Sequence, residues 1–311
     1  MIAIWIAGRA FWLNFGSMKP SVFILIFFAP ILALVALSGA AAACGNERVC
    51  TMPGLDGGTY YLAVPKGKSQ KIFVYFHGHN GSGAGVIRNR RLVGALHQMG
   101  YIVVAPDGPE FTFSGRTSRG WAARPEGEEP RGKRDDILFV EKLVADVAKR
   151  YAIDPGQTLV SGFSSGGSMA WYFSCYSKMT LGGVVAVAGG LRRPLPGADT
   201  GEVKQTSVGT CPGGPRNLVH IHGFSDKQVP LEGRAIRSWH QGDVFEGIAI
   251  QRRTNRCRSR PDNIVIEDGY WCRSWTNCTL DKTVSMCLHK GGHGLPKNWL
   301  SLGLKWLDGA E

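Results

Sequence analysis

The sequence lacks the cysteine and histidine spacings of a metal protein. It contains no Cys-x-x-Cys and no mixed Cys/His spacing typical of a zinc site. Two His-x-His pairs, His77 with His79 and His220 with His222, could chelate zinc at strand ends, but a metal hydrolase needs an added carboxylate or a third ligand. We therefore expect no metal and no cofactor. We expect His77, His220 and His222 to be core residues or to support a site from behind.

The sequence also has little acid, and it has no internal repeat or linker. Asp and Glu number 24 against 36 Lys and Arg, so the formal net charge is +12. The absence of repeats and linkers argues against a repeat protein and against a chain of several domains. Hydrophobic residues make up 44% of the 311 residues, which excludes wholesale disorder. We therefore predict one large domain, over residues 44–311.

The first 43 residues contain no Asp or Glu and have the pattern of a secretory signal peptide. Arg9 and Lys19 precede an apolar run over residues 22–37, and small residues follow at 38–43. Cleavage after this stretch would leave a formal charge of 12 − 2 = +10. We therefore predict a secreted protein, extracellular or periplasmic, without stable membrane insertion once the leader 1–43 is removed.

Three alternatives concern this leader. Met18 would be a more ordinary start, which makes residues 1–17 an upstream extension or a mis-called start. An uncleaved membrane anchor is disfavoured by Pro30 and by the short apolar run. Lipid anchoring at Cys44 is a minor alternative, because a lipobox usually has Leu three residues before the cysteine and this chain has Ala41.

All the cysteines follow the leader. They are Cys44, Cys50, Cys175, Cys211, Cys257, Cys272, Cys278 and Cys287. An even number in an exported chain indicates disulfides, with free core thiols as the alternative. Pairing cannot be deduced from the sequence, but proximity favours Cys44 with Cys50, two bridges among the last four cysteines, and Cys175 with Cys211.

Apolar runs of strand length alternate with helical patterns. Strands are expected over 59–64, 71–76, 101–105, 157–163, 183–188, 218–222 and 283–288. Helices are expected over 136–151, 244–253 and 299–307, and long loops over 108–134 and 189–216. This alternation predicts an α/β fold with a mostly parallel central sheet and helices on both faces.

The sequence Gly162-Phe163-Ser164-Ser165-Gly166 lies between an apolar strand and a helical pattern. Gly-x-Ser-x-Gly at a strand-to-helix turn is typical of a nucleophile elbow, a tight turn that presents its serine to substrate. The glycines let strand and helix approach closely, and the helix N-terminus supplies N–H groups. We predict that Ser164 is a nucleophile.

A serine nucleophile needs a histidine base that a carboxylate holds in place. Asp226 follows the strand expected at 218–222, and His293 lies in a Gly-rich turn after the strand expected at 283–288. Because parallel strands end at one edge of a sheet, we expect Ser164, Asp226 and His293 to meet there as a triad. The alternatives are Glu232 or Asp243 for the acid and His289 for the base.

The same reaction needs donors for an oxyanion and a wall for the acyl group. We expect the backbone N–H groups of His79 and Ser165 to be the donors. Trp121, Trp271 and Trp275 are candidates for an aromatic wall, although each could instead pack in the core.

Ordered motifs across residues 57–308 resemble the secreted polyhydroxybutyrate depolymerase / feruloyl esterase family of α/β hydrolases. The motifs are His77-Gly78, Ala105-Pro106-Asp107-Gly108, Asp135-Asp136 with Phe139-Val140, Ile153-Asp154-Pro155, the sequence 162–167, His222-Gly223 to Asp226 with Val229-Pro230, and Gly291-Gly292-His293. The resemblance implies the α/β-hydrolase fold and a Ser-His-Asp carboxylesterase without a cofactor, with Ser164, Asp226 and His293 as its triad.

The chain departs from this family at two points. Gly294-Leu295 follows the histidine where members often have Thr-Trp, so the aromatic wall must come from elsewhere. The sequence runs 18 residues (311 − 293) beyond His293, so we expect no separate polymer-binding domain and no attack on solid polyester.

We therefore expect a secreted serine esterase that acts through an acyl-enzyme on an ester substrate, either a hydroxyalkanoate oligomer or, alternatively, a feruloyl or acetylxylan ester. Basic clusters around 88–91 and 252–260 would suit an anionic substrate or surface, or they form a solvated face. The leader makes nucleic acid an implausible partner. Two other hypotheses are a prolyl-oligopeptidase-type peptidase, which usually carries a gating domain, and a non-catalytic binding protein on a hydrolase scaffold.

Overall fold

The computed structural model describes residues 4–6, 9–11, 44–45, 48–54, 58–67, 69, 71–113, 115–123, 134–194, 209–236 and 239–307. The chain forms two compact units, Met1–Ala42 and Ala43–Glu311. In the first unit, β1 (Ile4–Ile6) pairs antiparallel with β2 (Arg9–Phe11). The apolar run and the cleavage region predicted for the leader lie outside the described residues. Among the helices that are described, none combines the length and hydropathy needed to cross a bilayer.

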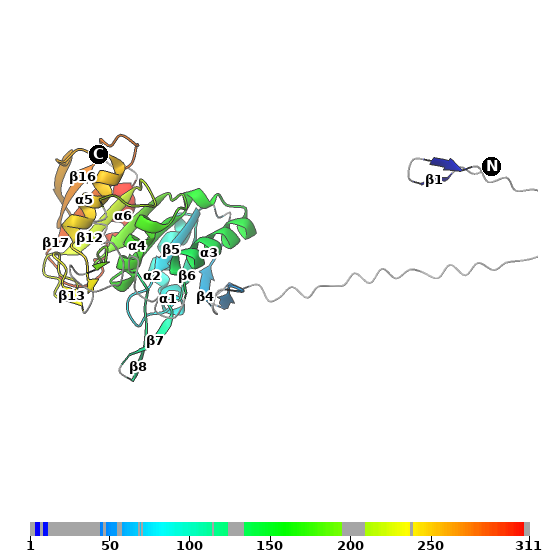
Figure 1. The fold of residues 1–311 in the computed structure, drawn as a ribbon, viewed down its shortest axis with the longest axis horizontal. Coiled ribbons are helices and arrows are strands. Elements are labelled where there is room, and N and C mark those ends of the chain that lie inside the picture. The colour runs from blue at the N-terminus through cyan, green and yellow to red at the C-terminus, as the bar shows by residue number, and fades with distance from the viewer. Residues whose placement is uncertain are drawn as a thin grey trace, which may run out of the picture. The chain divides into compact units, whose positions relative to one another are not determined.

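A mostly parallel sheet organises the second unit, and within the described residues it has ten strands (Figure 1). The six central strands run parallel, in the order β17 (Val284–His289), β12 (Leu218–Gly223), β10 (Gly183–Val187), β9 (Leu159–Phe163), β5 (Lys71–Phe76) and β6 (Tyr101–Pro106). Antiparallel strands extend both edges: β16 (Tyr270–Trp275) and β15 (Asn263–Glu267) beyond β17, and β4 (Thr59–Ala63) and β3 (Val49–Thr51) beyond β6. The parallel centre brings the carboxyl ends of six strands to one edge.

Helices cover both faces of this sheet (Figure 1). One face packs against α3 (Asp136–Tyr151), α4 (Ser165–Tyr176) and α5 (Val244–Asn255), and the other against α1 (Gly83–Arg88), α2 (Arg90–Gln98) and α6 (Trp299–Leu307). Side chains of β5 alternate between the two cores: Val74 and Phe76 enter the first, and Phe73 and Tyr75 the second. Burial on both faces explains why these strands are continuous apolar runs. The predicted α/β fold with helices on both faces is confirmed.

The predicted strands and helices are present with small shifts at their ends. Those over 71–76, 136–151 and 299–307 have the predicted bounds. The 3₁₀ turn η2 (Pro155–Gln157) shortens the strand predicted to begin at 157. The two predicted long loops were partly wrong. The first contains the hairpin of β7 (Glu110–Phe113) and β8 (Arg116–Arg119), and the second contains β11 (Arg193–Pro194), which joins β14 (Trp239–His240) and β13 (Ala235–Ile236) in a small sheet.

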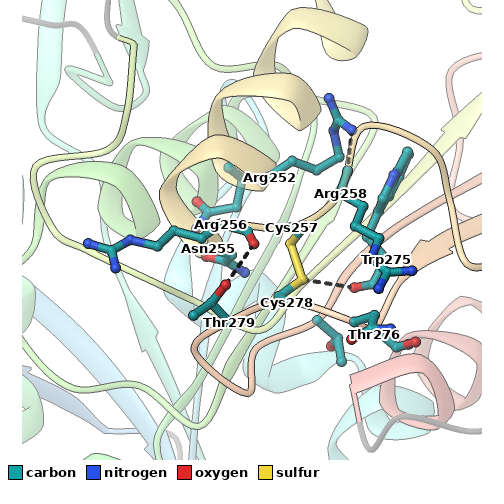
Figure 2. The surroundings of a disulfide bond; sticks show 12 residues. Arg252, Asn255, Arg256, Cys257, Arg258, Trp275, Thr276, Cys278 and Thr279 are labelled. Carbon is teal, nitrogen blue, oxygen red and sulfur yellow. Dashed lines mark hydrogen bonds between the residues drawn. A yellow bond between two sulfur atoms is a disulfide. The ribbon is translucent and has the colours of Figure 1, made fainter.

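All eight cysteines form disulfides. The bridges are Cys44–Cys50, Cys175–Cys211, Cys257–Cys278 and Cys272–Cys287, which confirms the pairings that proximity favours and divides the last four cysteines. Figure 2 shows the Cys257–Cys278 bridge, which fastens the end of α5 to the segment after β16. Trp275 and Thr279 flank it there, and Thr279 Oγ1 donates to the carbonyl of Arg256 at 3.3 Å.

Candidate active site

The turn between β9 and α4 presents Ser164 in a strained backbone conformation. Its φ is 59° and its ψ is −119°, a conformation that L-residues rarely adopt. The neighbouring glycines are required by close approach of backbone. A Cβ at Gly162 would lie 2.3 Å from the carbonyl oxygen of Gly166, and a Cβ at Gly166 would lie 2.0 Å from that of Phe76. The geometry is that of a nucleophile elbow.

Three side chains from three strand ends converge at this turn. Ser164 Oγ lies 2.8 Å from His293 Nε2, and His293 Nδ1 lies 2.7 Å from Asp226 Oδ2. Asp226 follows β12 and His293 follows β17, as the positions of these residues in the sequence predict. The carboxylate of Asp226 can only accept, so Nδ1 of His293 carries a proton, and Nε2 faces the serine hydroxyl whose proton a base must take.

The carboxylate of Asp226 is buried and almost saturated with donors. Its Oδ1 accepts from the backbone N–H groups of Gln228 and Val229 at 2.9 and 2.8 Å. Its Oδ2 accepts from Nδ1 of His293 at 2.7 Å and also lies 3.3 Å from Nε2 of His222. Burial alone would raise the pKa of Asp226, but the hydrogen bonds from His222, Val229 and His293 outweigh burial and hold that pKa well below its ordinary value. The group is therefore an anion at neutral pH.

A buried chain of hydrogen bonds supports this carboxylate from behind. Trp171 Nε1 donates to His220 Nδ1 at 3.0 Å, and His220 Nε2 lies 2.9 Å from His222 Nδ1. The indole can only donate, so His220 Nδ1 accepts and His220 Nε2 carries the proton that it donates to His222 Nδ1. His222 Nε2 then carries a proton, which it donates to the carbonyl of Val229 at 2.8 Å and toward Asp226. Burial, with His222 beside it, holds the pKa of His220 well below its ordinary value. These hydrogen bonds therefore direct the Nε2–H of His222 toward Val229 and Asp226.

The other predicted candidates for acid and base have different roles. Asp243 caps α5 by accepting the N–H of Glu246 at 3.0 Å, and Glu232 is exposed. His289 Nδ1 accepts the N–H of Gly291 at 3.0 Å, and its ring packs edge-on against Tyr270. Neither acid takes the place of Asp226 beside the imidazole of His293.

The first His-x-His pair divides its two rings between different tasks. His77 Nε2 accepts the N–H of Gly108 at 2.9 Å, and its Nδ1 lies 2.7 Å from the carbonyl of Gly78, so both nitrogens are used by the backbone. Burial lowers the pKa of His77 and keeps the ring neutral. His79 instead lines a cavity next to Ser164. His77 therefore braces the loop after β5, and His79 faces the cavity.

A cavity of about 300 Å³ opens beside Ser164. His79, Ser165 and Trp121, three of the predicted site residues, line it. Ser165 is the first residue of α4, so its N–H belongs to the helix N-terminus, and His79 belongs to the loop after β5. Trp121 is 1% exposed and donates its Nε1–H to the carbonyl of His77 at 2.8 Å, so it is both a core residue and a wall of the cavity.

The other two predicted tryptophans lie elsewhere, and neither lines this cavity. Trp271 stacks on Phe224 with ring centroids 6.1 Å apart, and its ring also faces Arg273. Trp275 is buried beneath the guanidinium of Arg252, 5.2 Å from its ring centroid (Figure 2). Both belong to β16 in the antiparallel extension of the sheet: Trp271 pairs with Leu288 near the carboxyl end of β17, and Trp275 pairs with Val284 at the start of that strand.

Most residues that line the cavity were not predicted, among them Arg192 and Trp239. Arg192 follows β10, and its guanidinium lies over the ring of Trp239, with Cζ 4.7 Å from the centroid. Both fall in segments expected to be loops or left unassigned. A signal was present for Arg192, because it follows a predicted parallel strand and therefore belongs to the same sheet edge as Ser164.

Residues 60–236 of this chain match the model of the phospholipase/carboxylesterase family. Feruloyl esterase C of Emericella nidulans is 25% identical over 203 residues, covering 61% of this chain and 63% of that protein. The probable feruloyl esterase C of Aspergillus niger is 23% identical over 225 residues, covering 67% of this chain and 72% of that protein. This chain therefore spans less than two thirds of the length of the Emericella nidulans relative.

Among solved structures, the acetyl xylan esterase from Aspergillus awamori is similar in fold. It matches with a TM-score of 0.57 and 15% identity, over 84% of this chain and 98% of that one. The likeness at this identity concerns the fold, which agrees with the sheet and helix layers described above.

Proposed function

Because this chain belongs to the phospholipase/carboxylesterase family of α/β hydrolases, we propose that it is a serine carboxylesterase with Ser164, His293 and Asp226 as its catalytic residues. The observation that carries the proposal is the unbroken chain of hydrogen bonds from Ser164 Oγ through His293 to Asp226, at 2.8 and 2.7 Å. Family membership supports the reaction class, and this geometry supports the choice of residues.

The proposed reaction has two halves. Ser164 Oγ attacks the ester carbonyl while His293 Nε2 takes the hydroxyl proton, and the carboxylate of Asp226 stabilises the resulting imidazolium. The tetrahedral oxyanion accepts from the backbone N–H groups of Ser165 and His79, each worth about 3 kcal/mol. The imidazolium then protonates the departing alcohol, leaving an acyl-Ser164 ester. In the second half His293 deprotonates a water, which attacks the acyl group and releases the acid.

A serine-to-alanine exchange tests this assignment. We expect Ser164→Ala to lower kcat/KM for 4-nitrophenyl acetate or butyrate by about 10⁴ or more, because the reaction loses its nucleophile. Ser174→Ala on the same helix is the matched control, since Ser174 is buried and its Oγ makes no hydrogen bond within the described part of the chain. Turnover by Ser164→Ala close to that of the control would refute the proposal.

For the ester itself we propose feruloyl or acetylxylan esters, because the relatives are feruloyl esterases. Hydroxyalkanoate oligomers are the second candidate, on the family resemblance of the motifs. A panel of methyl ferulate, acetylated xylan and hydroxybutyrate trimers separates them by kcat/KM. Peptidase activity would instead cleave a proline anilide, and a non-catalytic binding protein would turn over none of these compounds.

We further propose that the protein is secreted. Four disulfides suit an oxidising compartment, and the sulfur of Cys44 is bonded to Cys50, which leaves it no thiol for a lipid. Expression of the full sequence should release a protein whose amino terminus lies near Cys44. Retention of the entire chain inside the cell in reduced form would contradict secretion.

A further inference from the structure

The cavity beside Ser164 is lined with positive charge. Arg192 and Arg234 both contribute to its wall, and of the described residues that line it none is Asp or Glu. Arg192 comes from the segment after β10, and Arg234 directly precedes β13. A concave site with charge of one sign and low-dielectric walls concentrates its field on ligands of the opposite sign.

Arg192 lies close to the reacting atoms. Its Nη2 is 3.5 Å from Oγ of Ser165, the residue that follows the nucleophile and supplies a proposed oxyanion donor. A group that contacts this guanidinium is therefore only a few bonds from an ester carbonyl held at Ser164. The remaining surface of the cavity includes Trp121 and Ile236, which suit a short carbon chain.

The side chain of Arg192 is held as a rigid recognition group. It is 9% exposed, and its guanidinium lies over the buried ring of Trp239. Packing against this ring restrains the side chain, and a guanidinium can bind a carboxylate through charge-assisted hydrogen bonds. Arg193, the next residue, has different surroundings: it belongs to β11 and forms an ion pair with Glu246 at the start of α5.

We propose that this site selects esters that carry a carboxylate near the scissile bond, with Arg192 as the residue that recognises the carboxylate. The inference rests on the proposed esterase function and names its substrate class. The carboxylate belongs either to the acyl part, as in a monoester of a short dicarboxylic acid, or to the alcohol part, as in an acylated hydroxy acid. Both present the same anion to the guanidinium.

Two pairs of substrates separate these sources. Monomethyl glutarate against dimethyl glutarate places the charge in the acyl part, and 4-acetoxybenzoate against its methyl ester places it in the alcohol part. The quantity measured is the ratio of kcat/KM for the charged ester to kcat/KM for its neutral partner. We expect Arg192→Gln to lower this ratio about tenfold to hundredfold for one pair, because charge-assisted hydrogen bonds are worth about 1.5–3 kcal/mol. Arg193→Gln removes the same charge one residue away and should leave the ratio unchanged.

A binding measurement keeps the test independent of turnover. Calorimetric titration of Ser164→Ala with monomethyl glutarate and with 4-acetoxybenzoate should show binding of the preferred compound. Ser164→Ala/Arg192→Gln should lose this binding, and Ser164→Ala/Arg192→Lys should partly restore it. Circular dichroism confirms that each variant is folded. Equal ratios in wild type and Arg192→Gln for both pairs, with no loss of binding, would overturn the inference while leaving the esterase intact. If Ser164→Ala also leaves turnover unchanged, the proposed function falls first and this inference with it.

Discussion

His222 and His293 both lie within reach of the same carboxylate oxygen, Oδ2 of Asp226. His222 is completely buried and does not itself line the cavity; its Nε2 lies 3.3 Å from Asp226 Oδ2 and donates to the carbonyl of Val229 at 2.8 Å. Its contribution to the site is therefore to position Asp226 and to stabilise the anion. The supporting hydrogen bonds from Trp171 and His220 fix its tautomer.

Replacement of His222 tests this positioning. We expect His222→Gln to lower kcat/KM about tenfold to hundredfold and to move the acid limb of its pH profile to higher pH. The sign follows from the hydrogen bond: His222 helps to hold the pKa of Asp226 below its ordinary value, so loss of this donor lets the Asp226–His293 pair take up a proton at higher pH. His97→Gln, on α2 at the other face of the sheet, is the control. An unshifted acid limb with reduced stability would indicate a structural role only.

Among the elements, the strands that carry the site could be predicted because a strand buried on both faces is an uninterrupted run of apolar residues. The site residues follow these runs at turn-forming residues, so Ser164, Asp226 and His293 could be placed at one sheet edge. The hairpin of β15 and β16 was missed, although its turn, Asp268-Gly269 with φ of 50° and 78°, is a strong hairpin signal.

Side-chain orientation set the limit of the sequence prediction. His220 and His222 are two residues apart on β12, so they share one face of the sheet, but only the coordinates show that they join Trp171 and Asp226 in one chain. The positions of Trp239 and Arg192 depend on the small sheet of β11, β14 and β13, whose two-residue strands leave no periodic pattern.

The bridge from α5 to the segment after β16 should be a large source of stability. Removing it with Cys257→Ser/Cys278→Ser should lower the free energy of unfolding by about 3 kcal/mol, because the bridge closes a long loop in the unfolded chain. The Cys44–Cys50 bridge closes a much shorter loop, so its removal with Cys44→Ser/Cys50→Ser should lower the free energy of unfolding by about 2 kcal/mol. Guanidinium unfolding with the other disulfides oxidised measures both. An equal or reversed order would show that loop closure does not decide their contributions.

For the molecule as a whole, buried neutral histidines make stability depend on pH. Burial lowers the pKa of His220, with His222 adding to the effect, and burial also lowers the pKa of His77 against the opposing influence of the Gly78 carbonyl and of Asp107. Below about pH 6.5 the unfolded chain therefore binds protons that the folded chain does not, and acid favours unfolding.

We expect the free energy of unfolding to be level between pH 8 and 7 and to fall below about pH 6.5. His220 alone can contribute up to about 1.4 kcal/mol per pH unit in that range. The carboxylate of Asp226 has the same sign but acts only below the ordinary pKa of an aspartate, 3.8, and so does not enter this window. Guanidinium midpoints at pH 8, 7, 6 and 5 check the expectation. A midpoint that is constant or rises toward pH 5 would contradict it.

Ser164, Asp226 and His293 are separated by 62 and then 67 positions along the polypeptide, since 226 − 164 = 62 and 293 − 226 = 67. Ser164 is therefore synthesised long before His293. A growing chain, or a fragment cut between β12 and β17, lacks the imidazole that the proposed mechanism needs as its base. Under the proposed mechanism, the cell that synthesises this protein is protected from it until the last parallel strand is in place.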